Sequence, residues 1–488
     1  MRHSRIAALV AGTLGLLAAA VATPAFAQKL TPLTHQPPGG AFTPFLLTDG
    51  RVMVQANNLV DWYALSPDSH GRYVDGTWTK LASLPAAWNY APDAFASAVL
   101  ADGRLVVVGG EYNEGAFALT NLGAIYDPVA NTWTKLAPPA GWANIGDSPS
   151  VVLPDGRYVV GRKLDMQMAA LDPHTLTWSF LNSTGKSDFN SEEGWTLMPD
   201  GTFLTVDVKN APHSERYLPG SQMWVSDGST IVDLHEPTDV VGCISFPGGC
   251  YFPPGEVGPQ ILRPDGTVFA TGAAEAGQNG HTSLYTPGAA PGDPGTWTPG
   301  PDFPADDAGD ASASLLPNGH VLVNSNRGRL YEYDGTHLTQ TVASAGNGIL
   351  LQLPSGETLL TANRTAVYTS PGKPLAAWKP TITQAPNQVN RGQTYAIQGT
   401  QFNGLSQAAA LGDEFETSTN YPLIALYNIQ SGKVVFARTH DHSTMGVATG
   451  AALVSTQFEV PASAEVGPSW MVVIANGIAS ARHKVNVR

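Results

Sequence analysis

Residues 98–110 read Ala98-Val99-Leu100-Ala101-Asp102-Gly103-Arg104-Leu105-Val106-Val107-Val108-Gly109-Gly110. Two apolar runs flank the pair Asp102-Gly103 in this segment. An Asp-Gly pair between apolar runs is a strong hairpin signal, because a tight turn between strands needs a residue that accepts a positive φ angle. The segment therefore predicts two antiparallel strands joined by a short turn.

The same pattern returns along most of the chain. Several turns are 53 residues apart, as in 102 − 49, 155 − 102 and 318 − 265. A repeat of this length, with a Gly-Gly and a later Trp, is typical of a kelch-type β-propeller blade. We therefore expect an all-β protein with a seven-bladed propeller, in which the strand before each turn lines the axis and a Trp marks the outer strand. The turns are Asp49-Gly50, Asp102-Gly103, Asp155-Gly156, Asp200-Gly201, Asp265-Gly266, Asn318-Gly319 and Ser355-Gly356. The Trp residues are Trp78, Trp133, Trp178, Trp224, Trp297 and Trp378.

The repeat pattern stops near Trp378. Residues 381–488 instead contain short alternating strands, of which the segments 394–397, 423–427, 433–436 and 470–474 are the clearest. About a hundred residues of short strands suggest an immunoglobulin-like β-sandwich. The expected domains are a propeller over 28–380 and a C-terminal sandwich over 381–488.

The first 27 residues have the pattern of a secretory signal peptide. Arg2 and Arg5 precede an apolar stretch, and Ala25-Phe26-Ala27 fits a cleavage site. No later stretch is long and apolar enough to span a bilayer. We therefore expect a secreted or periplasmic protein without membrane insertion.

Charge and cysteine content narrow the partners. The net charge of −14 disfavours a nucleic-acid partner and suits a cationic ligand or a metal. Cys243 and Cys250 are the two cysteines, and in an exported protein they predict a local disulfide. A reactive or metal-binding thiol is the alternative. Nothing in the sequence demands an oligomer, and we expect a monomer.

Acidic residues recur at one position of the repeat, eight or nine residues before five consecutive turns, where the chain enters the inner strand; the first and last repeats have Ala41 and Asn347 there. A propeller converts such a register into a ring, so these side chains should converge at one axial mouth. Clustered carboxylates repel one another unless a cation or shared protons compensate. Oxygen ligands favour Ca²⁺, Mg²⁺ or Mn²⁺ over Cu²⁺. The alternative is a solvated funnel of carboxylates that hold water or cap backbone amides. The expected metal ligands are Asp93, Asp147, Glu192, Glu193, Glu256 and Asp310.

Polar loops after the second strands should open on the same face. Asn, Arg and Tyr suit a hydroxyl-rich ligand, so we expect a carbohydrate or another polyol to bind there. The candidate ligand-binding residues are Tyr112, Asn113, Arg162, Asn326 and Arg327. In the C-terminal domain His440 and His442 lie two residues apart after a strand, where both would point the same way and could hold a metal.

These features together resemble the galactose oxidase family of secreted copper-radical oxidases, over nearly all of the mature chain. The clearest matches are residues 284–302 with the blade that follows, and residues 470–479. The resemblance implies the fold, and a His from the last domain that reaches up the channel to the metal, for which His442 is the counterpart. It also implies a Cys–Tyr crosslink, but Glu256 and Asp310 stand at those two positions. We therefore expect the fold without the copper-radical activity.

The predicted function is a galactose oxidase-like propeller whose axial site binds a divalent cation and a carbohydrate or polyol. If it is an enzyme, the candidate catalytic residues are His442, Asp310 and Glu256. One alternative is a non-catalytic carbohydrate- or surface-binding module. Another is a copper-dependent alcohol or aldehyde oxidase that uses Cys250, Tyr251 and His442.

Overall fold

The computed structural model describes residues 28–236, 242–246, 248–275, 277–290, 292–412 and 416–488. Within these ranges the chain is built of strands, and the two helical segments are the short 3-10 turns η1 (Ala86–Trp88) and η2 (Ala376–Trp378). The prediction of an all-β protein is confirmed. The expected signal peptide, residues 1–27, lies outside the described residues. No helix among the described residues is long and apolar enough to cross a membrane.

The first part of the chain folds into consecutive antiparallel sheets. Each contains a four-stranded meander in which sequence order is spatial order, apart from the last, whose fourth strand comes from the N-terminus; the sixth sheet has a fifth strand, described below. The first three sheets are β2 (Pro44–Leu46), β3 (Val52–Gln55), β4 (Trp62–Ser66), β5 (Thr77–Lys80); β7 (Ala96–Val99), β8 (Leu105–Val108), β11 (Gly123–Asp127), β12 (Thr132–Lys135); and β13 (Ser150–Val152), β14 (Tyr158–Gly161), β15 (Met168–Asp172), β16 (Thr177–Leu181).

Four further sheets of this type follow among the described residues. They are β17 (Thr196–Leu197), β18 (Phe203–Val206), β19 (His213–Leu218), β20 (Met223–Ser229); β23 (Gln260–Leu262), β24 (Val268–Thr271), β25 (Thr282–Thr286), β26 (Thr296–Pro299); β27 (Ser312–Leu315), β28 (Val321–Asn324), β29 (Leu330–Tyr333), β30 (Leu338–Val342); and β31 (Leu350–Gln352), β32 (Thr358–Leu360), β33 (Ala366–Thr369), β1 (Lys29–Pro32). Two small hairpins project from loops, β9 (Tyr112–Asn113) with β10 (Ala116–Phe117), and β21 (Ile244–Phe246) with β22 (Gly249–Tyr251); β9 also pairs with β6 (Pro92–Asp93).

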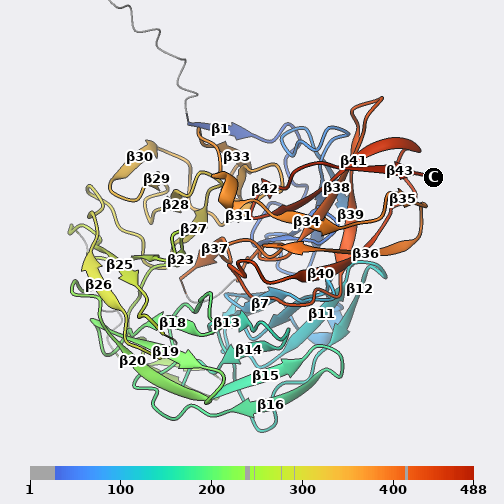
Figure 1. Ribbon diagram of the computed structural model, residues 1–488. Coiled ribbons are helices and arrows are strands. Elements are labelled where there is room, and N and C mark those ends of the chain that lie inside the picture. Colours follow the sequence, from blue (N-terminus) through green and yellow to red (C-terminus); the bar gives the residue numbers. More distant parts are fainter. Residues whose placement is uncertain (1–27, 237–241, 247, 276, 291, 413–415) are drawn as a thin grey trace, which may run out of the picture.

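The sheets lie around a common centre (Figure 1). Strands such as β13, β23 and β27 lie near the middle of the view, and β16, β20, β26 and β30 lie at its edge. The first strands of successive sheets contact one another, for example β2 with β31 and β23 with β27. The strand before each predicted turn is therefore the inner one. Five of the six marker Trp residues lie in outer strands as predicted, but Trp378 lies in η2, because β1 occupies the outer edge of that last sheet.

The predicted hairpins are present at the Asp-Gly turns. In the second sheet the Leu100 N–H donates to the Arg104 carbonyl at 2.8 Å, and the Gly103 N–H donates to the Leu100 carbonyl at 2.9 Å. Gly103 has a φ of +86°, whereas Asp102 stays outside the left-handed region and instead accepts the Arg104 N–H with its carboxylate. Only the glycine therefore needs a positive φ, and aspartate contributes by closing the turn with its side chain.

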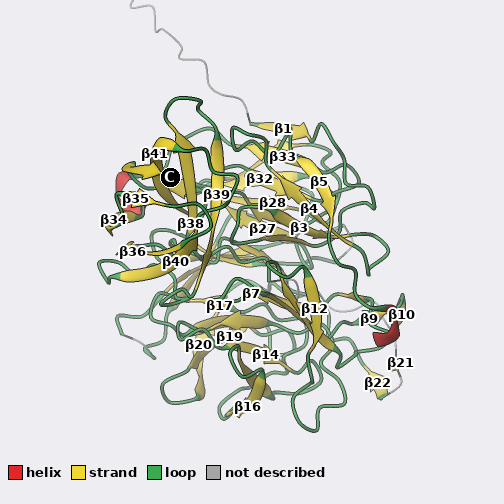
Figure 2. Ribbon diagram, turned by 90° about the vertical axis from the view of Figure 1, so that its right-hand side faces the viewer, coloured by secondary structure: helices red, strands yellow, loops and turns green. Residues whose placement is uncertain are grey.

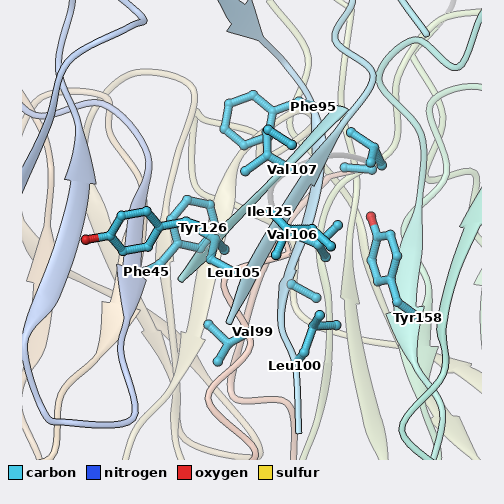
Figure 3. Packing of buried hydrophobic residues seen from close by; sticks show 14 of the residues in the cluster. Phe45, Phe95, Val99, Leu100, Leu105, Val106, Val107, Ile125, Tyr126 and Tyr158 are labelled. Atoms are coloured by element: carbon cyan, nitrogen blue, oxygen red, sulfur yellow. The ribbon is translucent and has the colours of Figure 1, made fainter. Parts of the chain in front are cut away.

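Apolar side chains of neighbouring sheets pack against one another. Figure 3 shows one such cluster, in which Phe45 of β2, Val106 of β8 and Tyr158 of β14 are buried together with their neighbours. These three residues come from three different sheets, so the core lies between the sheets as well as within them. Burying a large apolar side chain of this kind stabilises the fold by about 1.5–3 kcal/mol.

The C-terminal part forms a separate set of strands with its own core. Strand β39 pairs with β38 along one half and with β40 along the other, so it passes from one group of strands to the next. Ile397, Ile424, Phe458 and Val473 from these groups are buried in one cluster. The strands are β34 (Thr381–Gln384), β35 (Gln388–Val389), β36 (Thr394–Thr400), β38 (Leu423–Asn428), β39 (Val434–His440), β40 (Val454–Glu459), β41 (Gly467–Ala475), β42 (Ile478–Ala479) and β43 (His483–Val487).

One C-terminal strand leaves this set and joins the centre of the other sheets. Strand β37 (Ala409–Leu411) pairs antiparallel with β27 and also contacts β23 and β31. The Gly412 N–H then donates to the Ala311 carbonyl at 3.2 Å. The C-terminal part therefore sends the segment 409–412 along the inner strands towards Asp310.

A second C-terminal segment, 439–445, covers the turn ends of the first three sheets. It makes three backbone hydrogen bonds to residues that directly precede Asp-Gly turns and are spaced by 53 positions. These bonds run from the Thr439 N–H to the Thr48 carbonyl, from the His442 N–H to the Ala101 carbonyl, and from the Met445 N–H to the Pro154 carbonyl, each at 3.1 Å. The repeat thus supplies equivalent carbonyls as a docking surface.

This docking predicts unequal effects of two matched substitutions. Gly103→Ala places a Cβ 2.7 Å from Thr48 Oγ1 and 3.3 Å from the Thr439 carbonyl, whereas Gly156→Ala in the next sheet meets only the Ala101 Cβ at 3.8 Å. In both variants the alanine must adopt a left-handed backbone conformation, which costs about 1–2 kcal/mol. We expect Gly103→Ala to lower the thermal unfolding midpoint by several degrees more than Gly156→Ala. Equal midpoints in the two variants would contradict the docking.

Candidate functional site

Charged side chains gather where the inner strands begin, at the ends opposite to the Asp-Gly turns. Asp147 and Glu192 lie in the loops before β13 and β17, and Lys163 follows β14. The side chain of Lys163 is fully buried, and its Nζ donates to Asp147 Oδ2 at 2.6 Å and to Glu192 Oε1. The structure therefore brings together two of the predicted carboxylates and places an ammonium between them.

Tyr251 completes this group from a different part of the chain. Its hydroxyl donates to Glu192 Oε1 and lies 2.7 Å from the Ser191 hydroxyl, and its ring centroid is 5.0 Å from Lys163 Nζ. Tyr251 ends the hairpin β21–β22. Cys250 of β22 forms a disulfide with Cys243, which directly precedes β21, at a Cα–Cα separation of 5.6 Å, and this confirms the predicted pairing.

Glu111 is a member of the group that the repeat register missed. It follows β8 rather than preceding an inner strand, and its carboxylate lies with those of Asp147 and Glu192, one oxygen of each within 4.8 Å of the others. Burial raises the pKa of Glu111 to about 7, Lys163 opposes this, and Glu192 and Asp310 add to it. The polar residues after β8 indicate a functional loop in the sequence, but the repeat pattern does not distinguish Glu111 from the residues that follow it.

Two further predicted residues border the same group. Asp310 is exposed at the mouth, yet desolvation by the surrounding chain, followed by the charge of Glu192, raises its pKa to about 6, and Lys163 opposes the shift. Asp93 is half-buried; burial also raises its pKa, and its Oδ1 accepts the Ala94 N–H at 2.8 Å. Asp310 therefore senses the charges of Glu192 and Lys163, and the charge of Asp93 also raises the pKa of Asp310. The register therefore located real neighbours, although side-chain contacts join only some of them.

Aromatic rings cover one side of the group. Tyr112 and Phe117 of the hairpin β9–β10 lie with ring centroids 5.7 Å apart, and Phe117 stacks on Tyr251 at 6.0 Å and contacts Phe246 at 6.3 Å. Figure 2 shows the two hairpins, β9–β10 and β21–β22, side by side at the right-hand edge of the view. Tyr112 is 38% exposed, so this cluster reaches the surface.

Two hollows open next to these side chains. One, of about 170 Å³, is lined by Lys163, Ser191, Tyr251, Phe252 and their neighbours. The other, of about 240 Å³, has Asp310 in its wall. The second hollow also exposes side chains of Asn324, Asn326 and Asn347. Charged, amide and aromatic groups therefore face small spaces at the same end of the inner strands.

Three predicted site residues have other neighbours. The Glu193 carboxylate is paired with Lys186 Nζ at 2.8 Å, because the left-handed backbone at Glu192, with a φ of +59°, turns the next side chain away from Lys163. Glu256 exchanges two backbone hydrogen bonds with Glu236, at 2.9 and 3.0 Å. His442 is held at the turn end by its bond to the Ala101 carbonyl, so it does not lie with the Lys163 group.

The predicted polar loop residues are largely engaged within the protein. Asn113 accepts the Ala91 N–H at 2.9 Å. Arg162 donates to Asp165 at 3.1 Å. Asn326 donates to Asp307, while Arg327 is exposed. Of these five residues, Tyr112 is the one that lies in the aromatic cluster beside Lys163.

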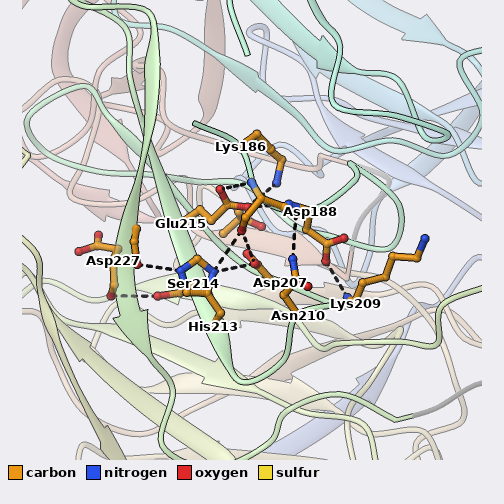
Figure 4. A network of polar contacts seen from close by, with 12 residues as sticks. Lys186, Asp188, Asp207, Lys209, Asn210, His213, Ser214, Glu215 and Asp227 are labelled. Carbon is orange, nitrogen blue, oxygen red and sulfur yellow. Dashed lines mark hydrogen bonds and ion pairs between the residues drawn. The ribbon is translucent and has the colours of Figure 1, made fainter. Parts of the chain in front are cut away.

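A second polar network surrounds Lys186 (Figure 4). Lys186 is fully buried and contacts Glu193 and, at 3.1 Å, Glu215. Asp207 lies beside them, with its Oδ2 2.7 Å from His213 Nδ1. Burial raises the pKa of Asp207 to about 6; Glu215 adds to this shift, and Lys186 and His213 oppose it. Each buried charge in this network has an opposite charge beside it.

The residues of the Lys163 group do not fit a copper site. The possible ligands are carboxylates and a phenol, which are harder than the imidazole and thiolate groups that suit copper, and the Lys163 ammonium has no lone pair to offer a metal. His442, the imidazole implied by the family resemblance, lies at the opposite end of the inner strands. The three carboxylates could instead hold a hard cation, but Lys163 already bonds to two of them.

The Lys163 ion pairs predict a stability effect. Lys163→Met leaves two buried carboxylates without their cation, which typically costs about 3–5 kcal/mol. We expect a correspondingly reduced free energy of unfolding in urea titrations, and little change in the exposed control Lys209→Met. The triple variant Lys163→Met/Asp147→Asn/Glu192→Gln should recover most of the loss. A triple variant no more stable than the single one would contradict the charge argument.

The raised pKa of Glu111 predicts a pH dependence. A carboxyl whose folded pKa lies above its unfolded value of 4.5 disfavours folding progressively as the pH rises from about 4.5 to 7. Glu111→Gln removes that penalty. Between pH 5 and pH 8 the free energy of unfolding of the variant should therefore rise by about 1–3 kcal/mol relative to that of the wild type. Denaturant titrations at both pH values test this. The exposed Glu114→Gln in the same loop should show no such gain.

Comparisons with known proteins support the fold expected from the sequence. No protein-family model matches the chain. The Kelch-like protein terF of Aspergillus terreus is 29% identical over 131 residues, which are 26% of this chain and 26% of that protein. The chain thus matches about a quarter of the length of that curated relative.

Among solved structures, a fungal alcohol oxidase of the AA5 family in complex with copper gives a TM-score of 0.51 at 14% identity, over 94% of this chain and 99% of that chain. Virginiamycin B lyase from Staphylococcus aureus gives 0.44 at 12% identity, over 70% and 98%. At these identities the oxidase likeness shows the fold alone. Together with the kelch-like relative, it supports a kelch-type, galactose oxidase-like protein with a propeller-like fold.

Proposed function

We propose that this protein is a secreted seven-bladed kelch propeller with an immunoglobulin-like C-terminal domain, whose axial mouth binds a carbohydrate or another polyol. The observation that carries the proposal is the Lys163 group, a set of buried hydrogen-bonding charges beside an exposed aromatic cluster. In this proposal the blades are the six four-stranded sheets and the five-stranded sheet β27–β30 with β37 of the described residues, the propeller covers 28–380 and the sandwich covers 381–488.

The polar half of the mouth suits hydroxyl groups. Glu111, Asp147 and Glu192 supply acceptors, and the Lys163 ammonium and the Tyr251 hydroxyl supply donors. Each hydroxyl of a sugar can donate and accept, so it can bond to both kinds of group. Because Lys163 lies between Asp147 and Glu192, the mouth is less negative than a ring of bare carboxylates and can accept a neutral ligand.

The apolar half suits the carbon face of a sugar ring. Tyr112 and Phe252 are 38% and 62% exposed, unlike most large aromatic side chains of the protein. Binding sites for small molecules combine such apolar surface with a few fixed polar groups. The two hollows of about 170 and 240 Å³ are each of the size of one sugar ring, so the ligand would engage the mouth with one or two residues of a chain.

A divalent cation is the second candidate ligand. The oxygens of Glu111, Asp147 and Glu192 lie within 4.8 Å of one another, and Ca²⁺, Mg²⁺ or Mn²⁺ prefers such donors. To bind these three carboxylates, the ion would have to displace the Lys163 ammonium from Asp147 and Glu192. Copper-radical oxidation is not part of the proposal, because the donor set lacks imidazole and the register positions hold Glu256 and Asp310.

The remaining features of the proposal concern the setting. The disulfide and the expected leader sequence support export to the periplasm or the exterior. The net charge of −14 argues against nucleic acid as a partner. We propose a monomer, since β1 completes the last sheet and so closes the ring of sheets within one chain.

Isothermal titration of the full protein with a panel of neutral oligosaccharides tests the ligand. We expect binding by the wild type, at least a tenfold weaker affinity in Glu111→Gln and Tyr112→Ala, and an unchanged affinity in Glu114→Gln. Titration with CaCl₂, MgCl₂ and MnCl₂ tests the second candidate. No binding of any glycan, or binding that neither variant weakens, would reject the carbohydrate site, and tight metal binding lost in Glu111→Gln would favour the cation instead.

A further inference from the structure

Three side chains of the fourth sheet form a continuous hydrogen-bonded chain. Asp207 Oδ2 lies 2.7 Å from His213 Nδ1, and His213 Nε2 lies 2.7 Å from the Ser226 hydroxyl oxygen. His213 and Ser226 stand on adjacent strands, β19 and β20, and Asp207 follows β18. This group is separate from the Lys163 group, and nothing in the proposed carbohydrate site uses it.

The order of the contacts fixes the role of each nitrogen. Because an aspartate carboxylate accepts hydrogen bonds, Nδ1 of His213 carries the proton and donates it to Asp207. Nε2 then has a lone pair and accepts the hydrogen bond of the Ser226 hydroxyl. A carboxylate, an imidazole in this tautomer and a hydroxyl in this sequence are the parts of an activated serine nucleophile.

The three side chains become more exposed from Asp207 to His213 to Ser226, as a site with a serine nucleophile requires. The Asp207 side chain is fully buried, 31% of the His213 side chain is exposed, and Ser226 is exposed. The carboxylate is therefore shielded, while the hydroxyl faces possible substrates. The register shift between His213 and Glu215 is a β-bulge, a device that redirects side chains and is often found next to active sites.

The backbone beside Ser226 offers a donor as well. β20 is the edge strand of its sheet, and the Trp224 N–H points away from the sheet to the Thr184 carbonyl at 2.9 Å. Alternate residues of a strand direct their N–H groups to the same edge. The Ser226 N–H therefore also points to the outer edge of the sheet, where it can donate to an oxyanion formed at its own side chain.

A metal ion explains the group less well. Asp207, His213 and Glu215 offer atoms within 4.8 Å of one another. However, both oxygens of Glu215 are engaged, Oε1 by Lys186 at 3.1 Å and Oε2 by the Ser187 N–H at 2.8 Å. Both nitrogens of His213 are engaged in the chain described above. Asp207 Oδ1 has no hydrogen-bond partner, but an ion would have to displace existing hydrogen bonds of both Glu215 and His213.

We infer that Ser226, His213 and Asp207 form an esterase-type site, separate from the carbohydrate site. This site would cleave short acyl esters at the outer edge of β20. Ser226 Oγ bonds to the ester carbonyl carbon, and its proton passes to His213 Nε2. The bond from that carbon to the alcohol oxygen then breaks, and the alcohol leaves with the proton from His213. Water repeats the sequence on the acyl-serine, releasing the acid and the free hydroxyl of Ser226.

The test uses the purified full-length protein with two probes, a fluorophosphonate and p-nitrophenyl acetate. The fluorophosphonate should add once, at Ser226, as located by peptide mass spectrometry; its fluoride leaves as the serine oxygen bonds to phosphorus. Ester hydrolysis should fall at least 100-fold in Ser226→Ala and in Asp207→Asn. The exposed serine Ser229 on the same strand supplies the matched control, and Ser229→Ala should behave like the wild type.

Ser187 provides a sharper control, because its hydroxyl also contacts Asp207, at 3.0 Å, and lies 3.4 Å from His213 Nδ1. Labelling that is lost in Ser187→Ala and kept in Ser226→Ala would overturn the assignment. Absence of labelling in the folded wild type, or hydrolysis that EDTA abolishes, would overturn it too. Because Ser226 is exposed, circular dichroism should show Ser226→Ala to be folded, so loss of activity cannot be ascribed to unfolding.

Discussion

The contact of the Lys163 ammonium with Asp147 and Glu192 is the constraint on which the axial mouth depends. Inner strands of successive sheets begin at the same end, so any carboxylate at that register is brought towards its neighbours. Two such carboxylates in a buried position repel each other strongly unless a positive charge is shared between them. Lys163 supplies that charge from within the chain. The ligand of the mouth is therefore not required to neutralise the site.

The fold could be predicted to a large extent, because its determinants are local and repeated. Asp102-Gly103 and its counterparts each specify a turn, and apolar runs around them specify strands. Two features could not be found this way. β1 completes the last sheet by pairing with β33, and β37 joins β27 from the C-terminal part. Both pairings join residues far apart in the sequence, and neither strand carries a mark of its distant partner.

The site was predicted less completely, for reasons that concern side-chain direction. The register includes both Glu192 and Glu193, yet the left-handed backbone at Glu192 separates their directions, so Glu192 meets Lys163 and Glu193 meets Lys186. Glu111 was missed because it follows a second strand instead of preceding a first one. His442 was chosen for its likeness to a family residue, but three backbone hydrogen bonds hold its segment at the turn end. Position in a repeat predicts proximity and does not predict contact.

The two charged networks show how one sheet can serve two purposes. Glu192 and Glu193 are consecutive, and their opposite orientation connects the mouth with the interior network around Lys186. The Lys186 network in turn holds Glu215, which lies one strand away from Ser226 and two residues from His213. A fully buried ion pair of this kind adds little net stability but resists rearrangement, since separating its members leaves a bare charge. Rigid placement of His213 and Ser226 therefore follows from charges that take no part in any reaction.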